Sequence, residues 1–535
     1  MGNASKVLKA TTQGLFYLAI LVLLISRTVS ANISHDENQF IAPGQLLAYD
    51  GMLPYVDYPY THMPYAIPLY ALSAWLAEYD LLAGRLLSTI TWLGCLLLMV
   101  AISRDLRPDP GMRAGGSPAW VQLLWEFALV YAFVHHVAMH FALRAALNHS
   151  LAAFLSLLGA WLYVRGARGQ APTWRAAFLS GAFLAAAGLT RFNFASLVPV
   201  LLVCWLIYGL REGRNSALRP VALYLGGALA ASVPALLLAA SASRQFYYGN
   251  LVYIRLNTIY YERQLHEIGM DLASKLGGFL SLMWAQPLDL LLYGVLLYTG
   301  LACLVQVVRR EPEADLARLG LAGCAAVLWM SAFAPTPALL HYLAAGLPFL
   351  FILVAAFSIR APRHQTVARA AGALAVLAAA ALSLKLEDPL RALRALAEPS
   401  EWPPYQMHEL ALEIREYVPS GRVLALQSMV PLEAGLDAYG FTATGPFSWR
   451  TSLLLTPERR QEYGVTSPEE LPLLLDATPP SAILVGFEAA NAGFERGDMG
   501  GLEKPLADYG EAHGYTAVAL QPPFWTRGLT LWLRP

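Results

Sequence analysis

The sequence predicts a mainly α-helical, polytopic membrane protein of about 11 transmembrane helices, with a small α/β domain at its C-terminal end. Three observations predict this fold class. The 535 residues are 57% apolar and 14% charged, with a mean hydropathy of +0.46, whereas soluble domains are typically about 45–50% apolar and about 25% charged. The apolar residues form many separate long runs. The charge is uneven: residues 1–385 hold 26 basic and 17 acidic residues, whereas residues 386–535 hold 11 and 20.

The apolar runs and the basic residues between them define a topology. A transmembrane helix needs about 20 apolar residues, and eleven runs approach this length: 13–30, 82–103, 118–137, 146–164, 174–190, 193–210, 219–240, 288–307, 316–334, 341–359 and 366–384. We interpret the first run as a retained helix, because no clear signal-peptide cleavage site follows it. With the N-terminus in the cytoplasm, 17 of the 26 basic residues of the membrane region flank cytoplasmic helix ends, as the positive-inside rule predicts. An odd number of spans then places the C-terminal end outside the cytoplasm.

This topology divides the chain into two domains. Residues 1–385 form the transmembrane domain, which has two long outer loops, 31–81 and 241–287. The first loop contains an apolar stretch from Pro64 to Leu76 that is too short to span and is typical of an interfacial helix. Residues 386–535 form the extracytoplasmic α/β domain, in which one helical and three β-like segments are expected: 409–417, 423–427, 482–486 and 517–520.

Composition excludes several classes of protein. The net charge is zero and the pI is about 7.2, which argues against nucleic-acid binding, because such proteins are normally basic. The four cysteines lie in apolar runs without metal-ligand spacing, so neither a zinc site nor a disulfide framework is indicated. Arginine outnumbers lysine 32 to 5, which is typical of a GC-rich bacterial genome. We therefore expect a multi-pass protein of a bacterial inner membrane.

Two adjacent carboxylates stand out in the first outer loop. Asp36 and Glu37 follow the first predicted helix by six residues. Two neighbouring carboxylates near an apolar wall tend to separate in pKa, because each negative charge disfavours the other. One of them could then act as a general base at neutral pH. On spacing alone, a pair of solvated loop carboxylates is the alternative.

The order of the surrounding residues carries a family resemblance. Arg27 closes the first helix, the Asp-Glu pair follows, Gly-Met-Leu-Pro-Tyr-Val-Asp ends at Asp57, and Gly-Arg-Leu at 84–86 opens the second helix. This order resembles the GT-C superfamily of integral membrane glycosyltransferases. The nearest types are the dolichyl-phosphate-mannose protein mannosyltransferases and the aminoarabinose transferases that modify lipid A. The motif covers residues 27–86, whereas the topology agrees over most of the chain.

The resemblance implies a reaction in which a sugar, hexosyl or pentosyl, moves from a polyprenyl-phosphate carrier to an acceptor on the extracytoplasmic side. It makes Asp36 the candidate base, with Glu37 steering or sharing that role. It gives Asp57 substrate or metal binding, with His62 as a neighbour. A metal site usually needs three or more protein ligands, so no cofactor is certain, and a divalent metal ion at Asp57 and His62 stays an open alternative.

Further residues are expected to bind the substrate. Arg191 lies at the outer end of the fifth predicted helix, where a basic residue is common in the family and where its planar fork would suit a lipid phosphate. Snorkelling to the interface is the alternative for this residue. His341 and Tyr342 stand where many relatives carry Arg-Tyr, and the charge of a histidine there would depend on pH. Arg27 completes the expected substrate-binding set.

The expected partners are a polyprenyl-phosphate-linked sugar, membrane lipid and an acceptor that could be a protein, a lipid or a polysaccharide, and no nucleic acid. Two other classes of protein were weighed. A transporter or lipid-carrier flippase would show internal repeats and helices broken at the bilayer midplane, whereas the polar residues of this sequence gather at the outer face. An envelope scaffold would leave the Asp-Glu pair without a role.

Overall fold

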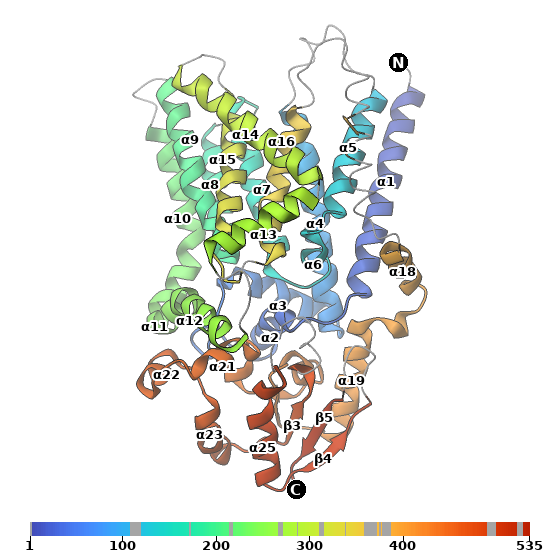
Figure 1. The fold of residues 1–535 in the computed structure, drawn as a ribbon, viewed down its shortest axis with the longest axis vertical. Helices are drawn as coiled ribbons and strands as arrows, with labels where there is room; N and C mark the ends of the chain where they lie inside the picture. Colours follow the sequence, from blue (N-terminus) through green and yellow to red (C-terminus); the bar gives the residue numbers. More distant parts are fainter. Residues whose placement is uncertain are drawn as a thin grey trace.

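The computed structural model describes residues 3–106, 119–170, 173–212, 218–265, 271–285, 287–309, 315–337, 339–357, 372–373, 376, 387–488, 499–521 and 528–535. A bundle of long helices forms one part of the molecule, and the C-terminal region lies below it (Figure 1). The two chain ends lie at opposite ends of the long axis. The bundle contains α1 (Asn3–Val29), α4 (Asp80–Asp105), α5 (Ala119–Val134), α7 (Asn148–Ala167), α8 (Thr173–Thr190), α9 (Leu197–Glu212), α10 (Leu218–Ser241), α14 (Pro287–Val308), α15 (Leu316–Ser331) and α16 (Leu347–Phe357).

Six helical segments of the described chain are long and apolar enough to cross a membrane: Val7–Val29, Asp80–Asp105, Asn148–Ala167, Phe192–Arg211, Leu218–Ser241 and Leu288–Val308. Three apolar helices are shorter: Trp120–Val134, Leu316–Ser331 and Leu347–Ala356. The chain is therefore a mainly helical, multi-pass membrane protein. The number of eleven spans stays a prediction, because the expected span 366–384 lies almost entirely outside the described residues.

Glycines let two helices of the bundle pack at backbone distance. A β-carbon on Gly181 of α8 would lie 2.0 Å from the carbonyl oxygen of Tyr224 in α10. One on Gly227 of α10 would lie 1.9 Å from the carbonyl oxygen of Phe178 in α8. Interfaces between membrane helices are enriched in small residues for this reason. This close contact with α10 fixes the position of α8, and Arg191 directly follows α8.

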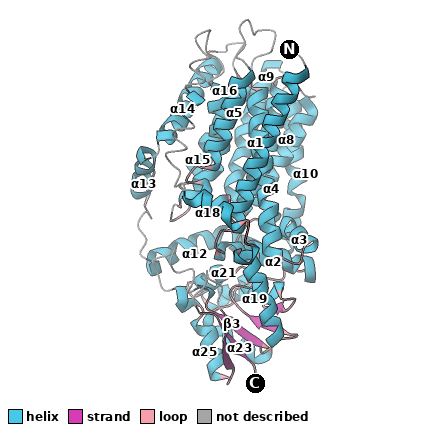
Figure 2. Ribbon diagram, turned by 90° about the vertical axis from the view of Figure 1, so that its right-hand side faces the viewer, coloured by secondary structure: helices cyan, strands magenta, loops and turns pink. Residues whose placement is uncertain are grey.

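Most of the two long loops folds into helices between the bundle and the C-terminal region, whereas residues 272–285 form a helix beside the bundle (Figures 1 and 2). The stretch from Pro64 to Leu76 is helical, as predicted, but the helix that precedes it was not predicted. Its signal was present, because Ser34 and Glu37 form a capping box, a motif that marks helix N-termini. The elements of the first loop are α2 (His35–Asp50), η1 (Pro64–Ala66) and α3 (Ile67–Leu76). Those of the second are α11 (Ser243–Tyr247), η4 (Tyr248–Val252), α12 (Tyr253–Tyr260), η5 (Tyr261–Leu265) and α13 (Leu272–Ala285).

Short 3-10 and helical segments connect the bundle helices: α6 (Met139–Ala142), η3 (Phe192–Ser196) and η6 (Leu340–Ala345). The predicted run 341–359 is therefore divided between η6 and α16. Both η3 and η6 stand at the C-terminal-region side of the bundle helices that follow them, and they bring Arg191 and His341 to that side.

The C-terminal region contains a five-stranded sheet with the order β2-β1-β3-β5-β4. The first three strands are parallel, and β5 pairs antiparallel with both β3 and β4. The three predicted β-like segments correspond to β1 (Arg422–Leu424), β3 (Ala482–Val485) and β4 (Thr516–Ala519). The sequence analysis missed β2 (Asp437–Ala438), which is only two residues long, and β5 (Thr530–Leu533).

The helices of the C-terminal region are α18 (Glu387–Ala395), η7 (Pro399–Glu401), α19 (Pro403–Tyr417), α20 (Met429–Glu433), η8 (Gly440–Thr442), α21 (Pro446–Ser452), α22 (Pro457–Tyr463), η9 (Pro468–Glu470), α23 (Leu471–Ala477), η10 (Met499–Leu502) and α25 (Lys504–Ala512). Of these, α25 packs against β3 and α20 against β2, whereas α18 packs against α1 of the bundle (Figure 1). The expected helix over 409–417 is the second half of α19.

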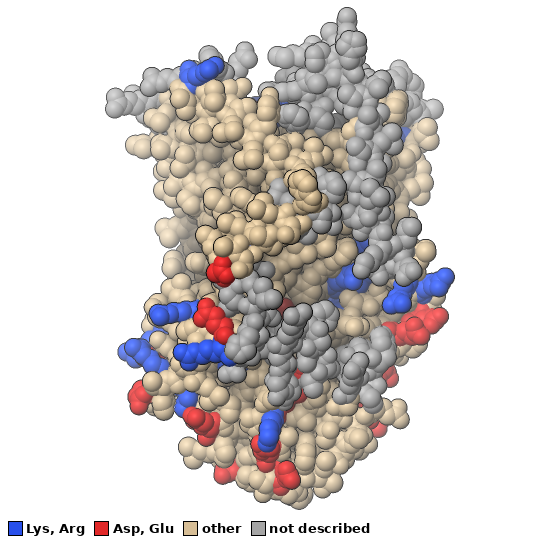
Figure 3. Space-filling model, viewed as in Figure 1, with Lys and Arg blue, Asp and Glu red and all other residues tan. Residues whose placement is uncertain are grey.

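The C-terminal region is packed onto the loop helices. Phe40 of α2 and Tyr70 of α3 belong to the same buried hydrophobic cluster as Met407 of α19. The Asn38 side chain of α2 accepts a hydrogen bond from the backbone N–H of Met429 at 2.9 Å. On the face drawn in Figure 3, the acidic side chains lie in the lower half, and the described surface of the bundle above them is almost uncharged. The border at residue 386 therefore separates two surfaces of different polarity but does not separate two independent cores.

Candidate functional site

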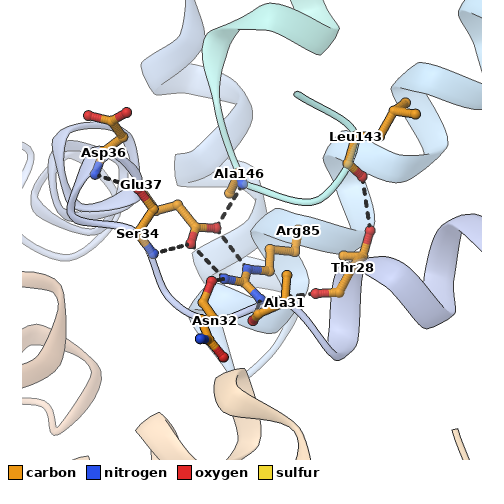
Figure 4. A network of polar contacts seen from close by, with 9 residues as sticks. All are labelled: Thr28, Ala31, Asn32, Ser34, Asp36, Glu37, Arg85, Leu143 and Ala146. Carbon is orange, nitrogen blue, oxygen red and sulfur yellow. Dashed lines mark hydrogen bonds and ion pairs between the residues drawn. The ribbon is translucent and has the colours of Figure 1, made fainter. Parts of the chain in front are cut away.

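The N-terminal turn of α2 directs its two carboxylates to different sides. The Ser34 hydroxyl accepts a hydrogen bond from the backbone N–H of Asp36 at 3.2 Å, and the Glu37 carboxylate accepts one from the backbone N–H of Ser34 at 3.1 Å. Consecutive residues of an α-helix point about 100° apart. Figure 4 shows the result, in which Glu37 points to Arg85 and Asp36 points away from it.

Glu37 and Arg85 form a buried ion pair, and both side chains are 0% exposed. The Arg85 guanidinium donates through Nε to Oε1 at 2.7 Å and through Nη2 to Oε2 at 2.6 Å. The backbone N–H of Ala146 donates to the same carboxylate at 2.8 Å. Arg85 also donates at 2.8–3.0 Å to the backbone carbonyl oxygens of Thr28, Ala31 and Asn32. This network joins α2 and α4 to the end of α1 (Figure 4).

The position of Glu37 corrects its expected role. Its carboxylate already accepts four hydrogen bonds and is enclosed by protein. A buried charge needs this degree of pairing, because its desolvation is costly. Glu37 does not line the cavity described below, and its contacts hold the turn that carries Asp36.

A cavity of about 650 Å³ lies at the junction of α2, the ends of the bundle helices and α21. Its size falls within the range of about 300–1,000 Å³ that is typical of small-molecule sites. The Asp36 side chain lines it and is 28% exposed. The charged and titratable side chains of its wall are those of Asp36, His62, His149, Arg191, Tyr253, Tyr261, His341, Tyr342 and Arg450.

Arg191 lines this cavity beside neutral partners. Its Nη1 lies 3.0 Å from Oδ1 of Asn148 and 3.2 Å from Nδ1 of His149. Its guanidinium carbon lies 5.6 Å from the centre of the Tyr342 ring. Burial lowers the pKa of Arg191 to about 10, and the nearby Asp36 charge opposes this shift. Within the described residues Arg191 forms no ion pair with a carboxylate, and its guanidinium faces the cavity.

The cavity histidines are neutral at physiological pH. Burial lowers the pKa of His62 to about 3, and the charge of Arg191 lowers it further. The same two causes lower the pKa of His341 to about 3. This corrects the expectation that the charge of His341 depends on pH near neutrality. His62 Nε2 lies 2.6 Å from the Gln39 side-chain oxygen, so these rings offer hydrogen bonds and not charge.

Two other predicted residues lie outside the cavity. The exposed Asp57 carboxylate accepts a hydrogen bond from the backbone N–H of Leu53 at 2.6 Å and closes a turn of its own loop. The buried Arg27 donates to the backbone carbonyl oxygen of Val134 at 2.9 Å and connects α1 to α5. Neither is among the residues of the cavity wall, so both expectations of substrate contact are corrected.

The donors expected for a divalent metal do not converge. Asp57 is used by its own turn, whereas His62 faces the cavity. A search of the described residues finds no group of three or more His, Cys, Asp or Glu side chains that could hold a metal ion. The residues present therefore do not fit a metal site built on Asp57 and His62.

The sequence analysis missed the contribution of the C-terminal region. Arg450 of α21 lines the cavity and is 5% exposed. Its Nη2 donates to the Asn257 side-chain oxygen of α12 at 2.7 Å, and its guanidinium carbon lies 4.7 Å from the centre of the Phe447 ring. No local pattern distinguishes this arginine, because its partners come from a helix almost 200 positions earlier in the chain.

The chain is similar in structure to known proteins, although its sequence matches none of the families compared. No protein-family model matches the sequence, and no curated protein matches it. The structure is similar to crystal structures of ArnT from Cupriavidus metallidurans, bound to undecaprenyl phosphate (TM-score 0.58, 14% identity) and in the apo state (TM-score 0.55, 13% identity). Each similarity covers 98% of this chain and 98% of that chain. This chain therefore has the same overall fold as ArnT over almost its whole length.

Proposed function

We propose that this protein is a glycosyltransferase that moves a sugar from a polyprenyl-phosphate donor to an acceptor on the extracytoplasmic side of the membrane. One observation carries the proposal: a single cavity holds a partly exposed carboxylate, Asp36, together with an arginine, Arg191, that forms no ion pair with a carboxylate among the described residues. The ArnT structure with undecaprenyl phosphate supports a donor of this chemical class through its shared fold.

The two residues suit the two halves of the transfer. An acceptor hydroxyl loses a proton when it attacks the anomeric carbon, and a carboxylate at Asp36 can accept it. The leaving lipid phosphate gains negative charge, which preorganised donors stabilise. The Arg191 guanidinium can bind a phosphate through two N–H groups. Asn148 and His149 hold that guanidinium at the cavity wall.

The Asp36→Asn variant tests the proposal. Purified protein is incubated with radiolabelled undecaprenyl-phosphate hexoses and pentoses and with envelope fractions as acceptor. We expect Asp36→Asn to lower transfer by about 10²–10⁴-fold while undecaprenyl phosphate still binds. The matched control is Asp50→Asn, an exposed carboxylate at the other end of α2. Full turnover in Asp36→Asn would contradict the role of Asp36 as the base. If the protein were instead a flippase, its movement of the lipid carrier would be unaffected by this substitution.

The proposal includes a topology with the N-terminus in the cytoplasm and the C-terminal region outside. It is supported by the opposite positions of the two chain ends (Figure 1) and by the placement of the basic residues. A cysteine introduced at Leu473, which is 82% exposed, reports the side, because the four native cysteines are buried. We expect an impermeant maleimide to label it in intact spheroplasts, and labelling only after lysis would contradict this topology.

A further inference from the structure

Two carboxylates are buried in the C-terminal region next to the N-terminus of α2. Glu488 follows β3 and is 0% exposed, and Glu503 precedes α25 and is 4% exposed. The Glu503 carboxylate accepts hydrogen bonds from the backbone N–H groups of Gly486 at 2.8 Å and Glu488 at 3.3 Å. Burying an acid is costly unless it is paired or protonated. The two residues therefore need an explanation that the fold of the sheet alone does not supply.

His35 connects this pair to the cavity. Its Nδ1 lies 3.5 Å from Oε2 of Glu488, and its Nε2 lies 3.5 Å from Oδ1 of Asp36. The ring packs edge-on against Phe447 of α21, with ring centres 5.3 Å apart, and the histidine side chain is 11% exposed. One imidazole thus has a carboxylate at each nitrogen, one facing the cavity and one enclosed by protein.

The two buried acids, Glu488 and Glu503, differ in their surroundings. Burial, together with the neighbouring Glu488 charge, raises the pKa of Glu503 to about 8. Of the two buried acids, Glu488 is the one that faces His35, whereas Glu503 accepts hydrogen bonds from the backbone. The charged groups of the cavity near Asp36 and Phe447 are the arginines Arg191 and Arg450.

We propose that His35 relays the proton taken up by Asp36 to Glu488, so that the C-terminal region takes part in the transfer reaction. This inference rests on the proposed function. Histidine suits the step because its two nitrogens can accept and release a proton at opposite edges of the ring. His35 and Glu488 act through Asp36 and are positioning residues, whereas Asp36 meets the substrate. Contacts of 3.5 Å are typical of a resting site whose hydrogen bonds shorten when substrate binds.

The step balances in atoms and charge. The acceptor oxygen forms a bond to the anomeric carbon, and the bond from that carbon to the phosphate oxygen breaks with its electron pair on the phosphate. The hydroxyl proton passes to the Asp36 carboxylate and then to His35 Nε2, and the proton on His35 Nδ1 passes to Glu488. Asp36 is thereby returned to its ionised form while the cavity is still closed by substrate. After the product leaves, the proton returns from Glu488 to His35 Nδ1 and from His35 Nε2 through Asp36 to water in the open cavity, because Glu488 is fully buried whereas Asp36 is partly exposed.

Kinetics of the full-length protein test the relay. We expect His35→Gln and Glu488→Gln each to lower kcat by about tenfold or more and to leave KM within about twofold. Because both residues act on one path, the loss of kcat in the double variant should be no greater than the larger of the two single losses. An independent, additive loss, or a loss confined to KM, would overturn the relay.

The protein contains a matched control. His408 of α19 lies 3.0 Å from Glu433 of α20, with side-chain exposures of 9% and 0%, close to the 11% and 0% of the proposed pair. Neither residue lines the cavity. We expect His408→Gln and Glu433→Gln to leave kcat within about twofold. An equal loss in these variants would mean that any loosening of the C-terminal region slows the reaction, and the relay would be wrong.

A measurement without substrate separates the relay from the proposed function. NMR of histidine-labelled protein follows the titration of the His35 ring, identified by its loss in His35→Gln. We expect both Asp36→Asn and Glu488→Gln to shift this titration, because each removes a carboxylate from one ring nitrogen, and His408→Gln to leave it unchanged. An unaffected His35 ring would overturn the relay even if transfer is observed. A coupled ring in a protein that transfers no sugar would instead contradict the proposed function.

Discussion

Arg85 and Arg191 mark two regions that lie on opposite sides of the first turn of α2 and use the same side chain differently. Arg85 is enclosed, paired with Glu37 and bound to three backbone carbonyl oxygens. Arg191 lines a cavity of about 650 Å³ and contacts Asn148, His149 and the face of Tyr342. Among the described residues, Arg85 is paired with a carboxylate, whereas Arg191 forms no such pair and faces the cavity.

The difference between the two arginines suggests that the Arg85 region stabilises the fold and that the Arg191 region binds a ligand. A buried ion pair whose partners are all supplied by protein specifies a geometry, because removing one partner leaves an uncompensated charge. An arginine that contacts neutral groups in a cavity can interact strongly with an anion that binds there. The closed region therefore orients the turn that carries Asp36, and the open region supplies the groups that can act on a substrate.

The largest effect is expected in the closed region. Glu37→Gln leaves the Arg85 charge buried without its counter-ion, which should lower the free energy of unfolding by about 3–5 kcal/mol. Unfolding by SDS titration in detergent measures it. The control is Glu462→Gln, which removes a partly exposed partner of Arg459 and should cost less than about 1 kcal/mol. Equal losses in the two variants would show that the Arg85 network is not specially required.

The next effect concerns ligand binding in the open region. Arg191→Gln removes a charged donor and should raise the Kd for undecaprenyl phosphate by about 10- to 100-fold, measured by titration of the purified protein. Arg191→Lys keeps the charge but loses the planar fork, so we expect an intermediate Kd. The fold should remain stable, because Arg191 has no ion pair among the described residues. Unchanged affinity in Arg191→Gln would move the phosphate site elsewhere.

The cavity should also respond to acid. The pKa of His62 is lowered to about 3 by burial and by Arg191, whereas an unfolded histidine titrates near 6.5. The unfolded state therefore binds more protons between these values, and the stability contributed by neutral His62 is lost as pH falls from 6.5 toward 3. We expect His62→Gln to reduce the fall of Tm between pH 6.5 and 4. An identical Tm profile in the variant would show that His62 is not buried in its neutral form.

The smallest effect is expected at Asp57, outside both regions. Asp57→Asn weakens the hydrogen bond from the backbone N–H of Leu53, which should lower stability by about 0.5–1.5 kcal/mol. The Kd for undecaprenyl phosphate should stay within about twofold, since Asp57 does not line the cavity. A large loss of affinity with unchanged stability would return Asp57 to the site and weaken the contrast between the two regions.

The predictions succeeded where the signal is local. The apolar runs gave most of the bundle helices and their order, the stretch from Pro64 to Leu76 is helical, and three of the five strands were expected. Asp36, His62, Arg191, His341 and Tyr342 all line one cavity. The failures are contacts between distant segments. Glu37 could not be distinguished from Asp36 in a dipeptide, because Arg85 lies 48 positions later and reaches only one of them.

Sequence alone determined that this chain has many apolar helices, a polar first long loop with two carboxylates and a C-terminal region of different polarity. These features follow from composition and periodicity, which each segment carries by itself. Tertiary structure decided which carboxylate faces the cavity, that Arg450 joins its wall, and that His35 contacts Glu488. Those contacts join residues up to about 450 positions apart, and packing of the C-terminal region onto α2 creates them. A local sequence pattern determines the face of a helix on which a side chain lies, whereas its contact partners depend on how distant segments pack together.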